Sequence, residues 1–191
     1  GADVLLAFVE SYGAVTYDNQ VMAESLAPSR AALGAAIREA GREVVSAYVD
    51  SPTFGGSSWL AHLSLLTGVD VRDQYAYVAV MASSRDTLPK AFARQGYRSI
   101  GLMPGMRQAW PEGAFYGFDF IYGRNDLEYH GPKFGWWSIP DQYTLARFDA
   151  AELGRTPRAP VFAVFPTSTT HAPFGPVAPY QPDWSRVLGA D

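Results

Sequence analysis

The sequence contains no cysteine, only two lysines and no long apolar run. The absence of cysteine excludes a mini-protein held together by disulfides, although it leaves the cellular compartment open. No apolar stretch approaches the roughly 18 residues needed to cross a bilayer, and the amino terminus lacks the basic-then-apolar layout of a signal peptide. The chain as given is therefore expected to be soluble.

Charge is also scarce, because charged residues make up only 18% of the chain. The formal net charge is −4, and the basic residues are scattered along the sequence. Neutralising nucleic-acid phosphates requires a clustered excess of Lys and Arg, so this balance argues against a general nucleic-acid binder.

What the sequence does have is length and apolar content that suit a folded domain. Its 191 residues are 48% hydrophobic, which is enough to bury a core and excludes a disordered chain. No internal repeat or linker interrupts it. We expect a single domain over residues 1–191.

Apolar patterning in the first quarter predicts a strand, a helix and a second strand. The run 3–9 is almost entirely apolar and ends at Glu10, as in a strand buried on both faces. Helical spacing of apolar residues predicts a helix over 28–40, with Pro28 in its first turn and a glycine as its stop. Residues 43–49 then have the composition of a buried strand.

The same alternation continues along the chain. Further elements are predicted as helices over 57–68 and 87–96 and as strands over 98–103 and 160–166, with a loop-rich aromatic region before the last strand. Strands that alternate with helices predict an α/β fold, with a mainly parallel central sheet and helices on both faces.

Three features follow predicted strands: Glu10, the Gly-Gly-Ser-Ser turn that ends at Ser58, and His171. Open α/β sheets place their chemistry at the carboxyl ends of strands. A helix entry stabilises an arriving anion, and a serine there becomes a nucleophile if a base or metal ion activates it. Glu10 offers a hard oxygen ligand for such a metal.

Each of these residues also has a purely structural interpretation. Ser57 and Ser58 suit helix capping, Glu10 suits a solvated loop, and His171 suits a turn. The other two histidines, His62 and His130, suit packing or the surface.

Several well-defined catalytic motifs are absent. The sequence has no Gly-x-Ser-x-Gly elbow, no phosphate-binding loop ending in Gly-Lys-Ser/Thr, no Gly-x-Gly-x-x-Gly after a strand and no His-Glu-x-x-His. The residues at the strand ends are therefore the best lead to chemistry.

The order of these residues resembles the alkaline phosphatase/sulfatase superfamily. A buried strand ends in an acid, Glu10, and a hydroxyl at a helix entry, Ser58, precedes Thr67-Gly68 by nine positions. More narrowly, the chain resembles the sulfatase-like domains of bacterial membrane proteins, which include lipoteichoic acid synthases and phosphoethanolamine transferases. Further matching phrases are Gly96-Tyr97-Arg-Ser, Tyr116-Gly-Phe-Asp119, Phe134-Gly-Trp-Trp-Ser-Ile-Pro-Asp141 and Thr-Ser-Thr-Thr-His171-Ala-Pro-Phe.

The resemblance implies an alkaline phosphatase-like fold and a role for particular residues. Glu10 falls on a ligand of a divalent metal, of which Mn, Zn, Mg and Ca all remain open. Ser58 falls on the nucleophile that also binds the metal, with Ser57 as its rival. His171 falls on a histidine that contacts the substrate, and Trp59 and His62 are further candidates for substrate binding.

One departure from the family pattern leads us to expect a fragment. Family members complete the metal site with an Asp-His pair in a later Gly-Asp-His phrase, which is absent from this chain. We therefore expect a domain that is incomplete at its carboxyl end, with weak metal binding and little turnover. In the full-length protein, we expect a membrane anchor absent from this chain to hold the domain in an extracytoplasmic position, in the periplasm or at the outer face of the inner membrane.

The leading functional hypothesis is a metal-dependent hydrolase or transferase. Its substrate would be a phosphate or sulfate ester on a small molecule or lipid head group. The absence of cysteine favours phosphate, because formylglycine sulfatases modify a cysteine.

Two alternatives remain. One is a domain that has lost its chemistry and acts as a sensor or scaffold for an anionic ligand or a partner protein. The missing Asp-His pair and the aromatic residues Trp110, Trp136 and Trp137 favour this alternative. A metal-free serine hydrolase using Ser58, His171 and Asp183 is the third hypothesis.

Overall fold

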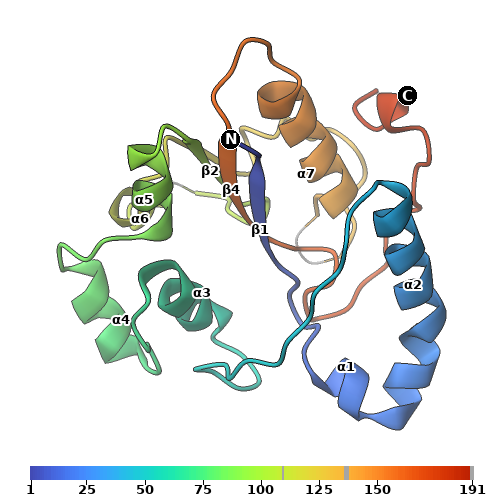
Figure 1. Ribbon diagram of the computed structural model, residues 1–191, viewed down its shortest axis with the longest axis horizontal. Coiled ribbons are helices and arrows are strands. Elements are labelled where there is room, and N and C mark those ends of the chain that lie inside the picture. Colours follow the sequence, from blue (N-terminus) through green and yellow to red (C-terminus); the bar gives the residue numbers. More distant parts are fainter. Residues whose placement is uncertain (109, 136–137, 190–191) are drawn as a thin grey trace. The chain divides into compact units, whose positions relative to one another are not determined.

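Four strands form one parallel sheet in the order β1-β4-β2-β3 (Figure 1). The computed structural model describes residues 1–108, 110–135 and 138–189. The strand bounds are β1 Val4–Phe8, β2 Arg98–Leu102, β3 Phe120–Tyr122 and β4 Val161–Pro166. In register, Leu6 of β1 and Gly101 of β2 lie on either side of Val164 in β4.

The central strand β4 supplies both faces of the sheet with core residues, because successive side chains of a strand point to opposite faces. Val161, Ala163 and Phe165 belong to one apolar cluster, and Phe162 and Val164 belong to a second. All five are buried. This is the double-sided burial that the apolar run in the sequence predicted.

Helices cover each of the two faces. One face carries α3 Ser58–Thr67, α4 Gln74–Met81, α5 Leu88–Arg94 and α6 Gly113–Tyr116; the other carries α7 Asp141–Phe148, which continues as the π-helix η1 Asp149–Leu153. A short 3-10 helix, η2 Trp184–Arg186, lies near the carboxyl end. The predicted α/β fold, with a parallel sheet and helices on both faces, is confirmed.

β1 is less buried than its sequence predicted. The apolar run indicated a strand buried on both faces, but Leu5 is 47% exposed and no residue of β1 is fully buried. β1 forms the edge of the sheet, where helices give less cover than over the centre. The prediction of the strand is correct and the prediction of its burial is wrong.

Residues 11–51 form a separate compact unit with two helices, α1 Val15–Asp18 and α2 Gln20–Glu39. Helix α2 begins eight residues before the predicted start, so Pro28 lies inside it rather than in its first turn. The guanidinium of Arg30 donates to the carbonyl oxygens of Ala23 and Thr16, at 2.6 and 3.0 Å. The helix ends before Gly41, as predicted, with φ of +67° at that glycine.

The strand predicted over residues 43–49 is not formed. The segment is irregular, and Val45 and Val49 are 94% and 87% exposed. Among the described residues no strand pairs with it. A strand pattern in sequence becomes a strand only when a neighbour satisfies its backbone groups, so the apolar pattern alone was misleading.

None of the helices within the described ranges has the length and apolar character of a membrane-spanning segment.

A buried carboxylate joins η1, on the face of the sheet that α7 covers, to strands β2 and β3. Glu152 of η1 is 2% exposed and accepts hydrogen bonds from Arg98 Nε and Nη2, at 2.6 and 2.9 Å, and from the Tyr122 hydroxyl, at 2.7 Å. Burial acts to raise the pKa of Glu152, but the bonds from Arg98 and Tyr122 outweigh it and leave the pKa below its usual value of 4.5. Glu152 is therefore ionised in the folded state.

We expect Glu152→Gln to destabilise the sheet unit by about 2–3 kcal/mol at neutral pH, less than for a fully buried pair because Arg98 reaches solvent. A carboxylate whose pKa is lowered by folding stabilises the fold at pH values above its pKa in the unfolded state. This stabilisation is lost as the pH falls through its pKa in the folded state. The difference in the free energy of unfolding between wild type and variant should therefore become smaller below about pH 4.5. Urea unfolding followed by tryptophan fluorescence tests this, because all five Trp lie outside residues 11–51. Glu39→Gln, on exposed α2, is the control; a difference that is constant from pH 3 to 7 would contradict the assignment.

Candidate functional site

The ends of β1 and β4 are tied together at the carboxyl edge of the sheet. Thr167 N donates to Phe8 O at 2.9 Å, and Glu10 N donates to Thr167 Oγ1 at 2.9 Å. The Thr167 hydroxyl also pairs with the Thr170 hydroxyl at 2.7 Å. These bonds fix the backbone of Glu10 against the loop that carries His171.

A sharp turn delivers Ser58 to the same edge. Gly55, Gly56 and Ser57 have φ values of +66°, +150° and +55°, in a region that glycine adopts easily and other residues rarely do. Ser58 is then the first residue of α3. The Ser57 side chain makes no capping hydrogen bond, so a capping role does not explain it.

Glu10 contacts both Ser58 and His62. The Ser58 hydroxyl lies close enough to the Glu10 carboxylate to lower its pKa, and His62 Nε2 lies 2.9 Å from Glu10 Oε1. Ser58 and His62 are four residues apart on α3 and therefore share a face of the helix. The His62 ring also packs on Phe8, with 4.1 Å between ring centroids. His62, expected as a packing residue or a substrate contact, thus belongs to the cluster.

His171 lies in the loop after β4, near enough to Glu10 for its charge to act on the carboxylate. Its backbone N–H donates to Ser168 O, and its ring Nδ1 contacts the carbonyl oxygen of Ala172. Burial acts to raise the pKa of Glu10, but His62, the Ser58 hydroxyl and the charge of His171 outweigh burial and lower this pKa. The structure therefore brings Glu10, Ser58, His62 and His171 together and keeps Glu10 ionised.

The other predicted residues are less closely involved. Trp59 is 49% exposed on α3, Ser57 is exposed beside the cluster, and His130 is exposed elsewhere. Asp183 accepts hydrogen bonds from Ser185 at η2, an ordinary capping role that gives no support to a Ser-His-Asp triad.

The aromatic residues that suggested a scaffold also differ from expectation. Trp110 is partly buried and packs on Tyr116, with 5.3 Å between ring centroids, so it belongs to the core. Trp136 and Trp137 lie outside the described residues.

Sequence reasoning missed the residue that anchors the His171 loop. Asp141, at the start of α7, accepts hydrogen bonds from Ser168 N at 2.7 Å, from Ser168 Oγ at 3.0 Å and from Thr169 N at 3.0 Å. In return, its own backbone N–H donates to Thr169 Oγ1 at 3.0 Å. The Pro-Asp pair that opens α7 was the available signal, since Asp is favoured in the first turn of a helix.

The donor set fits a divalent metal only in part. Glu10 and Ser58 supply two adjacent oxygen atoms, which hard cations prefer. Over residues 1–108, 110–135 and 138–189, however, no group of three or more His, Asp and Glu side chains is placed to hold a metal ion.

The sheet order and the helical layers define an α/β fold with a parallel central sheet. The chain is similar to the crystal structure of the lipoteichoic acid synthase LtaP from Listeria monocytogenes, with a TM-score of 0.51 and 16% sequence identity. The similarity covers 65% of this chain and 31% of the LtaP chain. No family model matches the sequence, and no curated protein matches it either. The structural similarity to LtaP confirms the fold expected from the family resemblance.

We expect Asp141→Ala to loosen the His171 loop while leaving the sheet intact. Removing the shared acceptor leaves the amides of Ser168 and Thr169 without a partner, at a cost of about 1–3 kcal/mol. Amide hydrogen exchange should therefore become roughly tenfold to a hundredfold faster at these two residues and stay unchanged in β4. Asp149→Ala, at the other end of α7, is the control, and unchanged exchange at Ser168 would show that Asp141 is not the anchor.

Proposed function

We propose that the carboxyl edge of the sheet is a phosphoester transfer site with Ser58 as its nucleophile. The observation that carries the proposal is that the Ser58 hydroxyl, at the first turn of α3, lies beside the ionised Glu10 and lowers its pKa. An ionised acceptor activates the hydroxyl, and the exposed N–H groups of the helix entry favour an anionic substrate there. Similarity of the fold to LtaP supports the same class of chemistry.

The proposed first step forms a phosphoserine. Ser58 Oγ attacks phosphorus in line, the bond from phosphorus to the leaving alcohol oxygen breaks, the serine proton passes to the Glu10 and His62 pair, and the leaving oxygen takes a proton from water. Glu10 and Ser58 would also hold a divalent metal, which when bound supplies Lewis-acid stabilisation of negative charge. His171 stabilises the charge on the phosphate oxygens.

In the second step, water or an acceptor alcohol attacks the phosphoserine and restores Ser58. The acceptor that reaches the site decides between hydrolysis and transfer. We propose phosphate esters as the substrates, on a small molecule or lipid head group at the outer side of a membrane, with sulfate esters as the weaker candidate. The chain spans about a third of LtaP, so the activity of a whole protein is part of this proposal.

A second candidate is a domain that keeps the fold without the reaction and binds an anionic ligand. The observation in its favour is that the described residues offer no cluster of three metal ligands. Metal titration separates the two candidates.

We expect Ser58→Ala to abolish covalent labelling by an activated phosphodiester in the presence of Mn²⁺, while Ser57→Ala keeps it. The reason is that Ser58, and not Ser57, contacts Glu10. Mass spectrometry of the peptide that contains both serines measures the label after a single turnover. Labelling that survives in Ser58→Ala and disappears in Ser57→Ala would transfer the role to Ser57.

We also expect weak binding of Mn²⁺ or Zn²⁺ that depends on Glu10. Glu10→Gln removes the charge of the main oxygen ligand and should weaken binding roughly tenfold or more. Calorimetric titration measures this, with Glu39→Gln as the matched control. An absence of heat with the wild-type chain would favour the non-catalytic candidate.

A further inference from the structure

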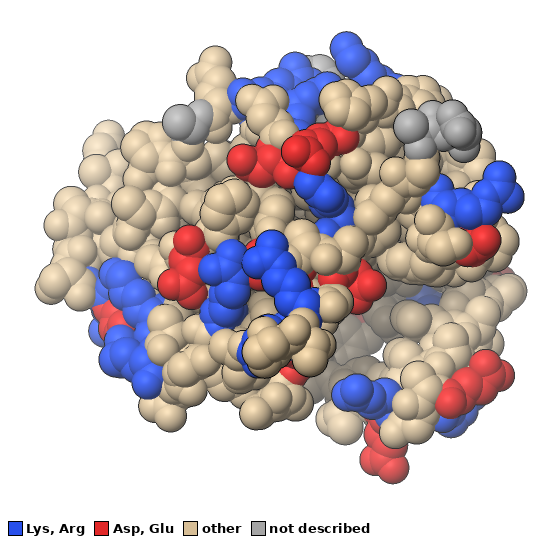
Figure 2. Space-filling view, turned by 90° about the horizontal axis from the view of Figure 1, so that it is seen from above, with Lys and Arg blue, Asp and Glu red and all other residues tan. Residues whose placement is uncertain are grey.

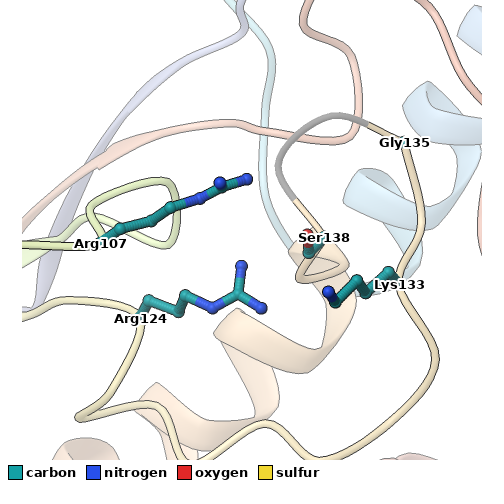
Figure 3. A pocket seen from close by; sticks show the side chains of 5 residues that line it. All are labelled: Arg107, Arg124, Lys133, Gly135 and Ser138. Carbon is teal, nitrogen blue, oxygen red and sulfur yellow. The ribbon is translucent and has the colours of Figure 1, made fainter.

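Three basic side chains surround one cavity at the carboxyl side of β2 and β3. Arg107 lies in the loop after β2, and Arg124 and Lys133 lie in the chain after β3. The cavity has a volume of about 310 Å³, and Gly135 and Ser138 complete its lining. Figure 3 shows the two guanidinium groups and the ammonium group pointing into the same space from different segments.

Backbone hydrogen bonds hold these segments in place. Arg124 N donates to Met106 O at 2.9 Å, which joins the loop of Arg124 to the loop of Arg107. Phe134 and Ser138 exchange two bonds, at 3.0 and 3.2 Å, and Ser138 is only 4% exposed. The cavity therefore has a fixed wall, and its cations do not sit on freely moving loops.

The lining contains three positive charges and no carboxylate. On the face drawn in Figure 2, by comparison, Lys and Arg side chains lie among Asp and Glu side chains. Within the described part of the chain, neither Arg124 nor Lys133 forms an ion pair with Asp or Glu. Three like charges around one space repel one another, and an anion bound between them removes that cost.

We propose that this cavity binds a phosphate group that carries two or more negative charges. Arginine offers planar pairs of N–H donors that match phosphate oxygens, and lysine adds a point charge. The Ser138 hydroxyl lines the same space and can donate a further bond. The volume lies at the lower end of small-molecule sites, which suits a phosphate or diphosphate group.

This anion site is distinct from the Ser58 cluster, although the two approach each other through Gly135. Gly135 also lines a narrow groove with His171, and a Cβ atom placed on Gly175 would lie 2.6 Å from the Gly135 Cα. None of the three cations belongs to the proposed catalytic machinery. The proposal therefore goes beyond the proposed function and does not require it to be correct.

Calorimetric titration with inorganic phosphate and diphosphate, in the presence of a chelator that removes metal ions, tests the site. We expect both anions to bind, diphosphate more tightly, and Arg124→Ala and Lys133→Gln each to weaken binding roughly tenfold, while Arg72→Ala, at an exposed position, leaves it unchanged. Thermal unfolding confirms that each variant is folded. Equal affinities in Arg124→Ala, Lys133→Gln and Arg72→Ala, or no binding of either anion, would overturn the proposal.

Ser58→Ala separates this proposal from the catalytic one, because it should keep full diphosphate binding. A loss of diphosphate binding in Ser58→Ala would place the anion at the Ser58 cluster and would overturn the second site.

Vesicles distinguish a lipid source of the phosphate from a free one. Vesicles that contain phosphatidic acid should bind the wild-type chain and Arg72→Ala, but not Arg124→Ala, if a head group fills the cavity. Binding of soluble diphosphate without vesicle binding would assign the site to a free phosphate. Vesicle binding that all three forms share, with no diphosphate binding, would reflect surface charge alone and would contradict the proposal.

Discussion

The pairing of β1 with β4 is the constraint on which the rest of the site depends. Two segments that are more than 150 residues apart in sequence become neighbours through this ladder. At its end, the Thr167 hydroxyl accepts a hydrogen bond from the backbone of Glu10 and fixes its position. Because both strands point the same way, the loops that follow them open at the same edge. Helix α3 packs on Phe162 and Val164 of β4, and this packing places the first turn of α3 at the carboxyl edge of the sheet. The geometry of the candidate site thus follows from strand order.

Sequence predicted the parts of the fold in which local chemistry and tertiary packing agree. The β4 run was apolar on both faces because it lies between two layers of helices, and Thr87 with Pro89 marked the start of α5, where the Thr87 hydroxyl accepts from Lys90 N. Prediction from the sequence failed where the structure of a segment depends on residues that are distant in the sequence. Residues 43–49 have strand composition without a pairing partner among the described residues, and Pro28 was tolerated within α2. Helix α7 was missed because it lies in the aromatic region that the sequence predicted as loops.

The Ser58 cluster and the cavity lined by three basic residues differ in how well the sequence predicted them. Glu10, Ser58 and His171 each follow a strand or a turn with a recognisable pattern, so their meeting was predictable from the rule for open α/β sheets. Arg107, Arg124 and Lys133 belong to no motif, and their convergence depends on β3 lying beside β2. The anchor at Asp141 was equally hidden, because its partners come 27 residues later.

The contact between Gly135 and Gly175 limits which amino acids these positions accept. Any residue other than glycine at position 175 would collide with the opposing main chain, and position 135 has a φ of +56°, which most side chains disfavour. Two sites that are forty positions apart are thereby restricted by geometry and not by reactivity. A survey of tolerated substitutions would find position 175 nearly invariant and position 135 restricted to residues that accept a positive φ, even in variants selected for no catalytic task.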